Sequence, residues 1–205
     1  GEHTIMDLQL RHLSDRFDSD LISIVVGFKK EMIMEAHPGV SYIYNDEFGD
    51  TNTSKSLQRA LRLTGKDPVL WLNGDVVFDP SVLEILQPYI DRDQSFVAVN
   101  TESVSDEEVK YTLDDRGFIN EISKQVVGGL GEAVGINFVG SSDKPFLAAR
   151  LEDCEPQDYF ERGIELSITR DRRKFRAVDI SAARCMEVDF PTDLAQAETT
   201  FADLS

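Results

Sequence analysis

Cysteine is scarce in this chain of 205 residues, which contains only Cys154 and Cys185. Two cysteines far apart in the sequence make neither a disulfide framework nor a zinc site, so we expect two buried or half-buried thiols in a reducing compartment. Histidine is also sparse, and His3, His12 and His37 show neither metal-ligand spacing nor the pattern of a catalytic triad. The sequence therefore gives no support for zinc chemistry or for a Ser–His–Asp or Cys–His nucleophile.

Long apolar runs are missing as well. The longest, such as residues 21–28, have the length of a strand and fall well short of the roughly 20 residues that cross a bilayer. Residues 1–4 have neither the basic nor the apolar region of a cleavable signal. We therefore expect a cytoplasmic protein with no membrane insertion.

Positively charged residues are few. The chain has 21 Lys and Arg residues against 38 Asp and Glu residues, which gives a formal net charge of −17 at pH 7. Such a chain has no basic surface to displace counterions from nucleic acid or to attract an anionic membrane, so we exclude nucleic-acid partners. Most of the surplus carboxylates are expected to be solvated surface that maintains solubility. An anionic substrate would need a metal ion or a local group of Lys and Arg.

The pattern of apolar residues predicts a single α/β domain over residues 1–205, with a mixed, mostly parallel sheet flanked by helices. In the first half, strand-like and helical segments alternate, which favours parallel strands with crossover helices. In the second half, strands joined by turns come before further helices. The predicted strands are 21–27, 40–44, 69–72, 95–99, 109–113, 118–122, 133–139 and 175–180, and the predicted helices are 5–17, 29–37, 53–63, 80–89, 145–151, 157–169 and 191–201.

Acidic turns follow two of these segments. Gly74 lets the backbone turn after the strand 69–72, so Asp75 lies at the carboxyl end of a strand, where open α/β sheets bind ligands. Asp189 stands in a second acidic turn, 187–194, directly before a helix. Two carboxylates at strand ends can share one Mg²⁺, and a shared Mg²⁺ lets an acidic protein hold a nucleoside triphosphate. Each aspartate alone also fits a cap of the following turn or helix, so both interpretations stay open.

The helix predicted to begin after Asn52 offers free N–H groups that bind an anion or a carbonyl, and Lys55 adds one positive charge. Capping by Asn52 or Thr53 is the commoner use of such a sequence, and a helix start can serve both purposes.

The glycine-rich stretch 128–135 lacks the Lys-Ser or Lys-Thr of a phosphate-binding P-loop and does not open a helix. We interpret it as a loop that lets a substrate approach Glu132, against the alternative of simple flexibility. Lys110 and Lys124 interrupt strand-like segments, and either one fits a position facing a crevice or an exposed site on a strand.

Five segments of the chain carry short motifs in a fixed order, and they are 44–57, 72–77, 109–124, 131–136 and 187–194. Taken together, these segments resemble the nucleotidyltransferase family that activates sugar phosphates, phosphocholine and inositol phosphate. The first resembles the Tyr-Asn…Asn-Asn-x-x-Ser-Leu segment of the choline-phosphate cytidylyltransferase branch. The others resemble the family's Gly-Asp metal strand, its central hairpin, its Gly-Glu-x-x-Gly-Ile strand and its closing Glu-Ile-Asp-x-Pro-Glu-Asp-Leu segment.

The resemblance implies a role for each matching residue. Asp75 and Asp189 would hold Mg²⁺, and Asn52 and Ser56 would lie near the nucleoside. Glu132 would contact the acceptor, which is the second substrate, and Lys124 would contact the phosphate of that acceptor.

The implied reaction joins a nucleoside triphosphate, with CTP favoured, to phosphocholine, inositol phosphate or a sugar 1-phosphate. A phosphate-monoester oxygen attacks the α-phosphorus and pyrophosphate leaves. No protein nucleophile is needed, because positioning and charge neutralisation carry the rate.

The family begins with a buried strand, a Gly-x-Gly-x-Arg loop and a Pro-Lys segment, whereas residues 1–7 resemble the family's segment just after that lysine. We therefore expect the native protein to carry roughly 25–30 more residues before residue 1, from the usual lengths of strands and loops.

Two other function classes stay open. A glycosyltransferase of the related nucleotide-sugar fold would be expected to carry an Asp-x-Asp motif, but Asn73 stands two residues before Asp75 and Val77 two residues after it. A non-catalytic nucleotide-binding module of the same fold is the other alternative. The sequence also leaves a homodimer open.

Overall fold

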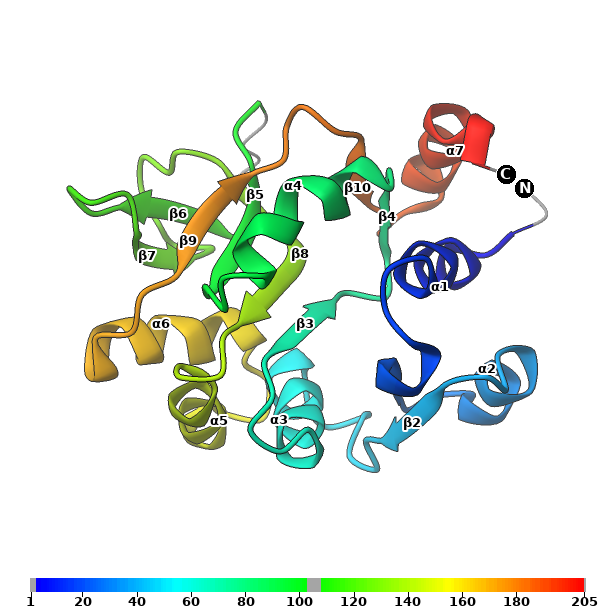
Figure 1. Cartoon of the computed structure of the whole chain (residues 1–205), viewed down its shortest axis with the longest axis horizontal. Coiled ribbons are helices and arrows are strands. Elements are labelled where there is room, and N and C mark those ends of the chain that lie inside the picture. Colours follow the sequence, from blue (N-terminus) through cyan, green and yellow to red (C-terminus); the bar gives the residue numbers. More distant parts are fainter. Residues whose placement is uncertain (1–2, 103–107, 205) are drawn as a thin grey trace. The chain divides into compact units, whose positions relative to one another are not determined.

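The computed structural model describes residues 3–102 and 108–204, which form two compact units. Unit 1 comprises residues 1–12, 70–140 and 174–205, and unit 2 comprises residues 13–69 and 141–173. Figure 1 labels the helices and strands of both units. The assignment of residues 1–205 to a single domain stays a prediction.

The main sheet belongs to unit 1 and has six strands among the described residues, in the order β7-β6-β8-β5-β9 with β3 also paired to β8. A second, two-stranded antiparallel ladder joins β4 to β10. The strands are β3 (Val69–Leu72, with residues 70–72 in unit 1), β4 (Val76–Phe78), β5 (Phe96–Asn100), β6 (Lys110–Leu113), β7 (Ile119–Ser123), β8 (Glu132–Val139), β9 (Arg176–Asp179) and β10 (Cys185–Glu187).

The helices of unit 1 are α1 (Ile5–Ser14, with residues up to 12 in this unit), α4 (Ser81–Ile90), α7 (Pro191–Thr200) and the short 3₁₀ helix η2 (Ala202–Leu204). Helix α4 packs against β5 (Figure 1), where the Tyr89 and Phe96 rings make a T-shaped contact with 6.0 Å between their centroids. Phe96 in turn stacks on Phe138 of β8 at 5.6 Å. Phe96 and Phe138 are fully buried and form the centre of the unit 1 core.

Unit 2 contains a pair of parallel strands, β1 (Ser23–Val26) and β2 (Ser41–Tyr44), with α2 (Lys30–Ala36) in the connection between them. Its other helices are η1 (Ser19–Leu21), α3 (Thr53–Leu63), α5 (Lys144–Asp153) and α6 (Phe160–Asp171). Gly163 lets α6 approach α5 closely, because a Cβ at this position would lie 2.6 Å from a methyl carbon of Leu151. The buried Lys144 ammonium ties α5 to the end of α3 by donating to the Thr64 hydroxyl at 2.6 Å.

The predicted mixed α/β class is confirmed, but the parallel share of the pairings is smaller than expected. Among the registers described, β1–β2 and β5–β9 are parallel, whereas β4–β10, β5–β8, β6–β7 and β6–β8 are antiparallel. The helical crossovers that impose parallel pairing are concentrated in the first half of the chain. Of the antiparallel pairs described, β6–β7 is joined by a short turn, whereas β5–β8, β6–β8 and β4–β10 pair strands that are further apart in the chain.

Both cysteines are free thiols, Cys154 buried and Cys185 half-buried, as the sequence predicted. Burial raises the pKa of Cys154 to about 11 and that of Cys185 to about 12, so both stay protonated at neutral pH. In the described ranges, every helix is too short or too polar to cross a bilayer.

Candidate functional site

The turn that carries Asp75 connects β3 to β4 and is held by the backbone on two sides. The N–H of Asn73 donates to the carbonyl of Gly135 on β8 at 2.9 Å. On the other side, the N–H of Val188 donates to the carbonyl of Asp75 at 3.0 Å. The segment after β10, which carries Asp189, therefore runs beside the turn after β3. All of these residues belong to unit 1.

Gly135 makes this close approach possible. It has a φ of +68° and lies in an irregularity of the β5–β8 register, between the pairs Val97–Asn137 and Val99–Ala133. A Cβ on Gly135 would lie 2.8 Å from the side-chain nitrogen of Asn73 and 2.8 Å from a carboxylate oxygen of Glu187. The glycine therefore makes room for two polar side chains of the site.

The Asp75 carboxyl group lies in an environment that disfavours its charge. Burial raises its pKa, and the nearby negative charge of Asp189 raises it further, against the lowering effect of a backbone hydrogen bond. Within the described part of the chain, the Asp75 Oδ1 atom is buried and has no hydrogen-bond partner. A carboxylate in this state gains from a cation.

Three further carboxylates gather in the same unit. Glu108, Glu187 and Asp189 each offer an oxygen within 4.8 Å of the others, with the two glutamates half-buried and Asp189 exposed. Asp75 is not a member of this triplet. Its link to the triplet is electrostatic, because the negative charge of Asp189 raises the pKa of Asp75. Carboxylate oxygens are the donors that Mg²⁺ prefers, so the residues present fit a magnesium ion.

Asp189 does not cap helix α7, because the N-cap residue of this helix is Phe190. The cap of α7 is formed by Asp193, whose carboxylate accepts from the N–H groups of Asp189 at 3.1 Å and Phe190 at 2.8 Å. The Asp189 side chain is therefore not used as the cap.

Glu132 and Lys124 also belong to unit 1. Glu132 begins β8, opposite Asn100 on β5 and Lys110 on β6. Gly131, just before it, packs so closely that a Cβ would lie 2.4 Å from the Asn100 carbonyl oxygen. Lys124 follows the end of β7 and is exposed. Their contacts with an acceptor stay predictions.

Asn52 and Ser56 belong to unit 2, where both take part in local hydrogen bonds. The Asn52 side chain caps α3 by accepting from the N–H of Thr53 at 2.8 Å. The Ser56 hydroxyl accepts from the Asn45 side chain at 3.1 Å. The structure therefore contains the capping arrangement that the sequence offered as one alternative, and the contact with a nucleoside stays a prediction.

Lys55 does not supply charge to the start of α3. Its ammonium group donates to the carbonyls of Leu151 at 3.0 Å and Cys154 at 2.5 Å, at the carboxyl end of α5. The interpretation of Lys55 as the cation of an anion site is therefore wrong, because the free carbonyls of a helix end attract the same charge.

Sequence reasoning missed Glu108 and gave Glu187 no role. Glu108 reaches the acidic cluster because the next residue, Val109, accepts a hydrogen bond from the N–H of Ala133 on β8 at 2.8 Å. The sequence around residue 108 contains no local motif that predicts this long-range pairing.

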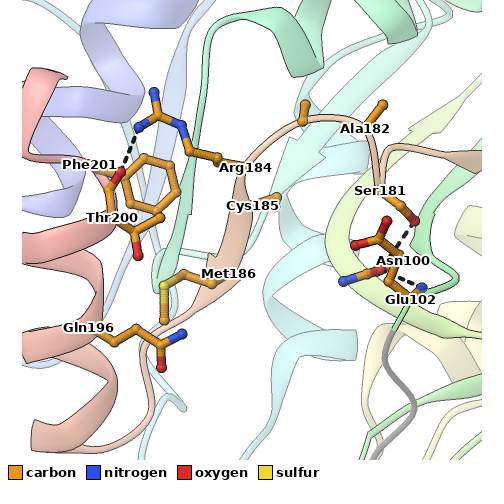
Figure 2. A pocket seen from close by; sticks show the side chains of 11 residues that line it. Asn100, Glu102, Ser181, Ala182, Arg184, Cys185, Met186, Gln196, Thr200 and Phe201 are labelled. Carbon is orange, nitrogen blue, oxygen red and sulfur yellow. Dashed lines mark hydrogen bonds between the residues drawn. The ribbon is translucent and has the colours of Figure 1, made fainter.

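Unit 1 also contains a pocket of about 300 Å³ between the end of β5, the 181–186 segment and α7 (Figure 2). Figure 2 shows the Arg184 guanidinium at one side, donating to the Thr200 carbonyl at 2.5 Å. None of the six residues predicted for the site lines this pocket.

The mixed sheet flanked by helices matches the nucleotide-diphospho-sugar transferase fold, which the comparisons with known proteins identify. Residues 28–142 match the family model described as glycosyl transferase family 2, and the chain belongs to this family.

Two solved structures that share this fold are named as cytidylyl or CTP transferases. The CTP:phosphocholine cytidylyltransferase of Streptococcus pneumoniae superposes with a TM-score of 0.75 at 15% identity, over 98% of this chain and 86% of that one. The inositol-1-phosphate CTP transferase of T. maritima gives a TM-score of 0.77 at 14% identity, over 98% and 82% of the two chains. The predicted resemblance to nucleotidyltransferases is thus confirmed at the level of the fold.

One curated relative is the CMP-5'-(3-aminopropyl)phosphonate synthase of Streptomyces rubellomurinus, which is 26% identical over 206 residues. The match covers 88% of this chain and 31% of the relative, so the chain spans about a third of that protein.

Proposed function

We propose that this chain forms a Mg²⁺-dependent nucleotidyltransferase, which couples a nucleoside triphosphate, with CTP favoured, to a small phosphate monoester and releases pyrophosphate. The observation that carries the proposal is the Asp75 Oδ1 atom, which is buried and has no hydrogen-bond partner among the described residues. Asp189 is near enough to raise the pKa of Asp75, and it forms an acidic cluster with Glu187 and Glu108. An acidic chain with such a cluster needs a divalent cation before it can hold a triphosphate.

Asp75 and Asp189 would hold the ion, with Glu187 and Glu108 close enough to orient ligands or water around it. When bound, Mg²⁺ neutralises the triphosphate and the charge that develops on the departing pyrophosphate. The raised pKa of Asp75 reflects a carboxylate that water solvates poorly, and such a group gains more from a cation than an exposed one.

The chain's own residues bind and align the two substrates. An oxygen of the acceptor phosphate forms a bond to the α-phosphorus, and the bond between that phosphorus and the bridging oxygen of pyrophosphate breaks. Glu132 would contact the acceptor and Lys124 its phosphate, while Asn52 and Ser56 would lie near the nucleoside. Holding the reacting atoms in line is the main contribution of the protein to the rate.

The names of the three similar proteins support the choice of substrates. Two of them use CTP and the third makes a CMP derivative, which favours a cytidine nucleotide. The first two names give phosphocholine and inositol 1-phosphate as the other substrate, and the third gives a CMP-linked (3-aminopropyl)phosphonate as the product. A phosphonate presents anionic oxygens like those of a phosphate monoester.

A glycosyltransferase is the second candidate, favoured by the family match over residues 28–142. Such an enzyme would consume a nucleotide sugar and release no pyrophosphate. The sequence departs from its expected Asp-x-Asp motif, because Asn73 takes the place of the first aspartate.

The test is a panel of four nucleoside triphosphates against phosphocholine, inositol phosphate, hexose 1-phosphates and 3-aminopropylphosphonate, with pyrophosphate release as the readout. We expect release with CTP and one of these acceptors, and its loss in Asp75→Asn. Asp115→Asn, in the exposed turn between β6 and β7, is the matched control. Activity that survives Asp75→Asn rejects the metal assignment, and transfer from a nucleotide sugar without pyrophosphate favours the second candidate.

The Glu132→Gln variant tests whether Glu132 contacts the acceptor. We expect a higher KM for the acceptor with an unchanged KM for the nucleotide, because only contacts with the acceptor are lost.

A further inference from the structure

Gln9 of α1 contacts the turn that carries Asp75. Its side chain is 8% exposed, and its single amide nitrogen donates to two carbonyl oxygens, those of Asn73 at 2.8 Å and Val76 at 2.8 Å. These carbonyls bracket Gly74 and Asp75. Gln9 therefore closes the turn from the α1 side, and all of these residues belong to unit 1.

The chemistry of the amide suits this position. A glutamine NH₂ group has two hydrogens that point in different directions, so one side chain can serve both carbonyls. The hydrogen bond inside the turn, from the N–H of Val76 to the Asn73 carbonyl, is long at 3.5 Å. The turn thus depends on outside donors, and leaving its buried carbonyls without one would be costly.

The three tethers of the turn reach it from different elements. Gly135 of β8 accepts from Asn73, Val188 after β10 donates to Asp75, and Gln9 of α1 holds the carbonyls on either side. Two of these three contacts are made by backbone groups, and the third is made by the Gln9 side chain. A substitution at Gln9 therefore removes its hydrogen bonds without changing the backbone.

The packing of α1 is carried by a different residue. Leu8, beside Gln9 in the sequence, belongs to a cluster of buried side chains with Val77, Ala197 and Phe201. Val188 packs against the same cluster, so Leu8→Ala controls for a loss of packing around the turn that removes none of the hydrogen bonds made by Gln9.

We propose that Gln9 is a positioning residue, which fixes the backbone on which the Asp75 carboxylate is presented to a divalent cation. This inference rests on the proposed function, because it concerns the same metal site. Residues that orient metal ligands from outside change metal affinity by roughly 10-fold to 100-fold when they are removed.

The test compares Gln9→Met, which keeps the length of the side chain and removes both donors, with Leu8→Ala, which disturbs the packing of the same helix. Mn²⁺ is the probe, and its binding is followed through the electron paramagnetic resonance signal of the free ion. We expect Gln9→Met to weaken Mn²⁺ binding about 10-fold. Leu8→Ala should lower the melting temperature and bind Mn²⁺ as the wild type does.

Amide hydrogen exchange supplies a readout without metal. The Val76 and Val188 amides should exchange roughly 10-fold faster in Gln9→Met than in the wild type, since two hydrogen bonds to the turn are lost. Leu8→Ala should leave the ratio of these rates to those of the β5 amides unchanged.

The outcomes separate the inference from the proposed function. Wild-type Mn²⁺ affinity and wild-type exchange rates in Gln9→Met overturn the positioning role, while loss of binding in Asp75→Asn still upholds the metal site. A wild-type protein that binds no Mn²⁺, or an Asp75→Asn variant that binds it fully, overturns both.

Discussion

The backbone N–H of Val188 donates to the carbonyl oxygen of Asp75 at 3.0 Å, and this bond sets the strand end that carries Asp189 beside the turn that carries Asp75. The two segments are therefore brought together by main-chain groups and not by their carboxylates. Substituting either aspartate removes a candidate metal ligand without removing the contact that places it.

Asp75→Asn and Asp189→Asn should each lower kcat/KM for pyrophosphate release by at least about 100-fold, because each removes one ligand of a shared ion. A shared ion also makes the two losses non-additive, so the double variant should be little worse than either single one. Losses that multiply in the double variant would indicate that the two aspartates act independently.

Gly135→Ala should cost about 1–3 kcal/mol of folding stability, because it combines a positive φ with contacts of 2.8 Å to Asn73 and Glu187. Gly128→Ala is the matched control, since Gly128 has a φ of +70° but no atom within 4 Å of the added Cβ. Chemical unfolding and Mn²⁺ titration of both variants give the comparison. Only Gly135→Ala should weaken Mn²⁺ binding, and equal effects of the two substitutions would contradict the close-packed site.

Asp79 should make stability depend on pH. The Arg184 guanidinium, followed by the Ser81 hydroxyl and N–H, lowers the pKa of Asp79 from 3.8 to about 2. A lowered folded-state pKa stabilises the protein above the unfolded-state pKa, and this stabilisation disappears as the pH falls through about 2. The advantage of the wild type over Asp79→Asn should thus be about 1 kcal/mol at pH 5, since Arg184 is partly exposed, and should shrink between pH 4 and pH 2.

Urea unfolding at several pH values measures this difference, with Asp115→Asn as the control that should follow the wild type throughout. A difference between wild type and Asp79→Asn that stays constant from pH 5 to pH 2 would rule out the ionised pair as its source.

Lys55→Met should destabilise unit 2 by about 1–2 kcal/mol, because it leaves the carbonyls at the end of α5 without their donor. Lys66→Met, at an exposed position, should change stability by less than about 0.5 kcal/mol. Thermal unfolding distinguishes the two. If Lys55→Met instead leaves stability intact and raises the KM for the nucleotide, Lys55 is a substrate residue after all.

Local signals in the sequence were sufficient for several elements. Helix α3 and strand β3 have the predicted bounds, 53–63 and 69–72, because Asn52 caps the helix start and Gly65 follows its end. The turn at Gly74 and the acidic turn after β10 were likewise visible, because the chain marks both with short motifs.

Features set by long-range pairing could not be read in the same way. The antiparallel direction of β8 against β5 and β6 depends on contacts between distant segments, and the same contacts bring Glu108 to the acidic cluster. Lys55 was misinterpreted for a related reason, since its acceptors lie about a hundred residues further along the chain.

Anomalous diffraction from crystals grown with Mn²⁺ and CTP would locate the ion itself. We expect a manganese peak about 2.0–2.3 Å from carboxylate oxygens of both Asp75 and Asp189, with the triphosphate on its other side. A manganese ion that contacts only one of these aspartates, or that lies away from both, would contradict a shared metal site.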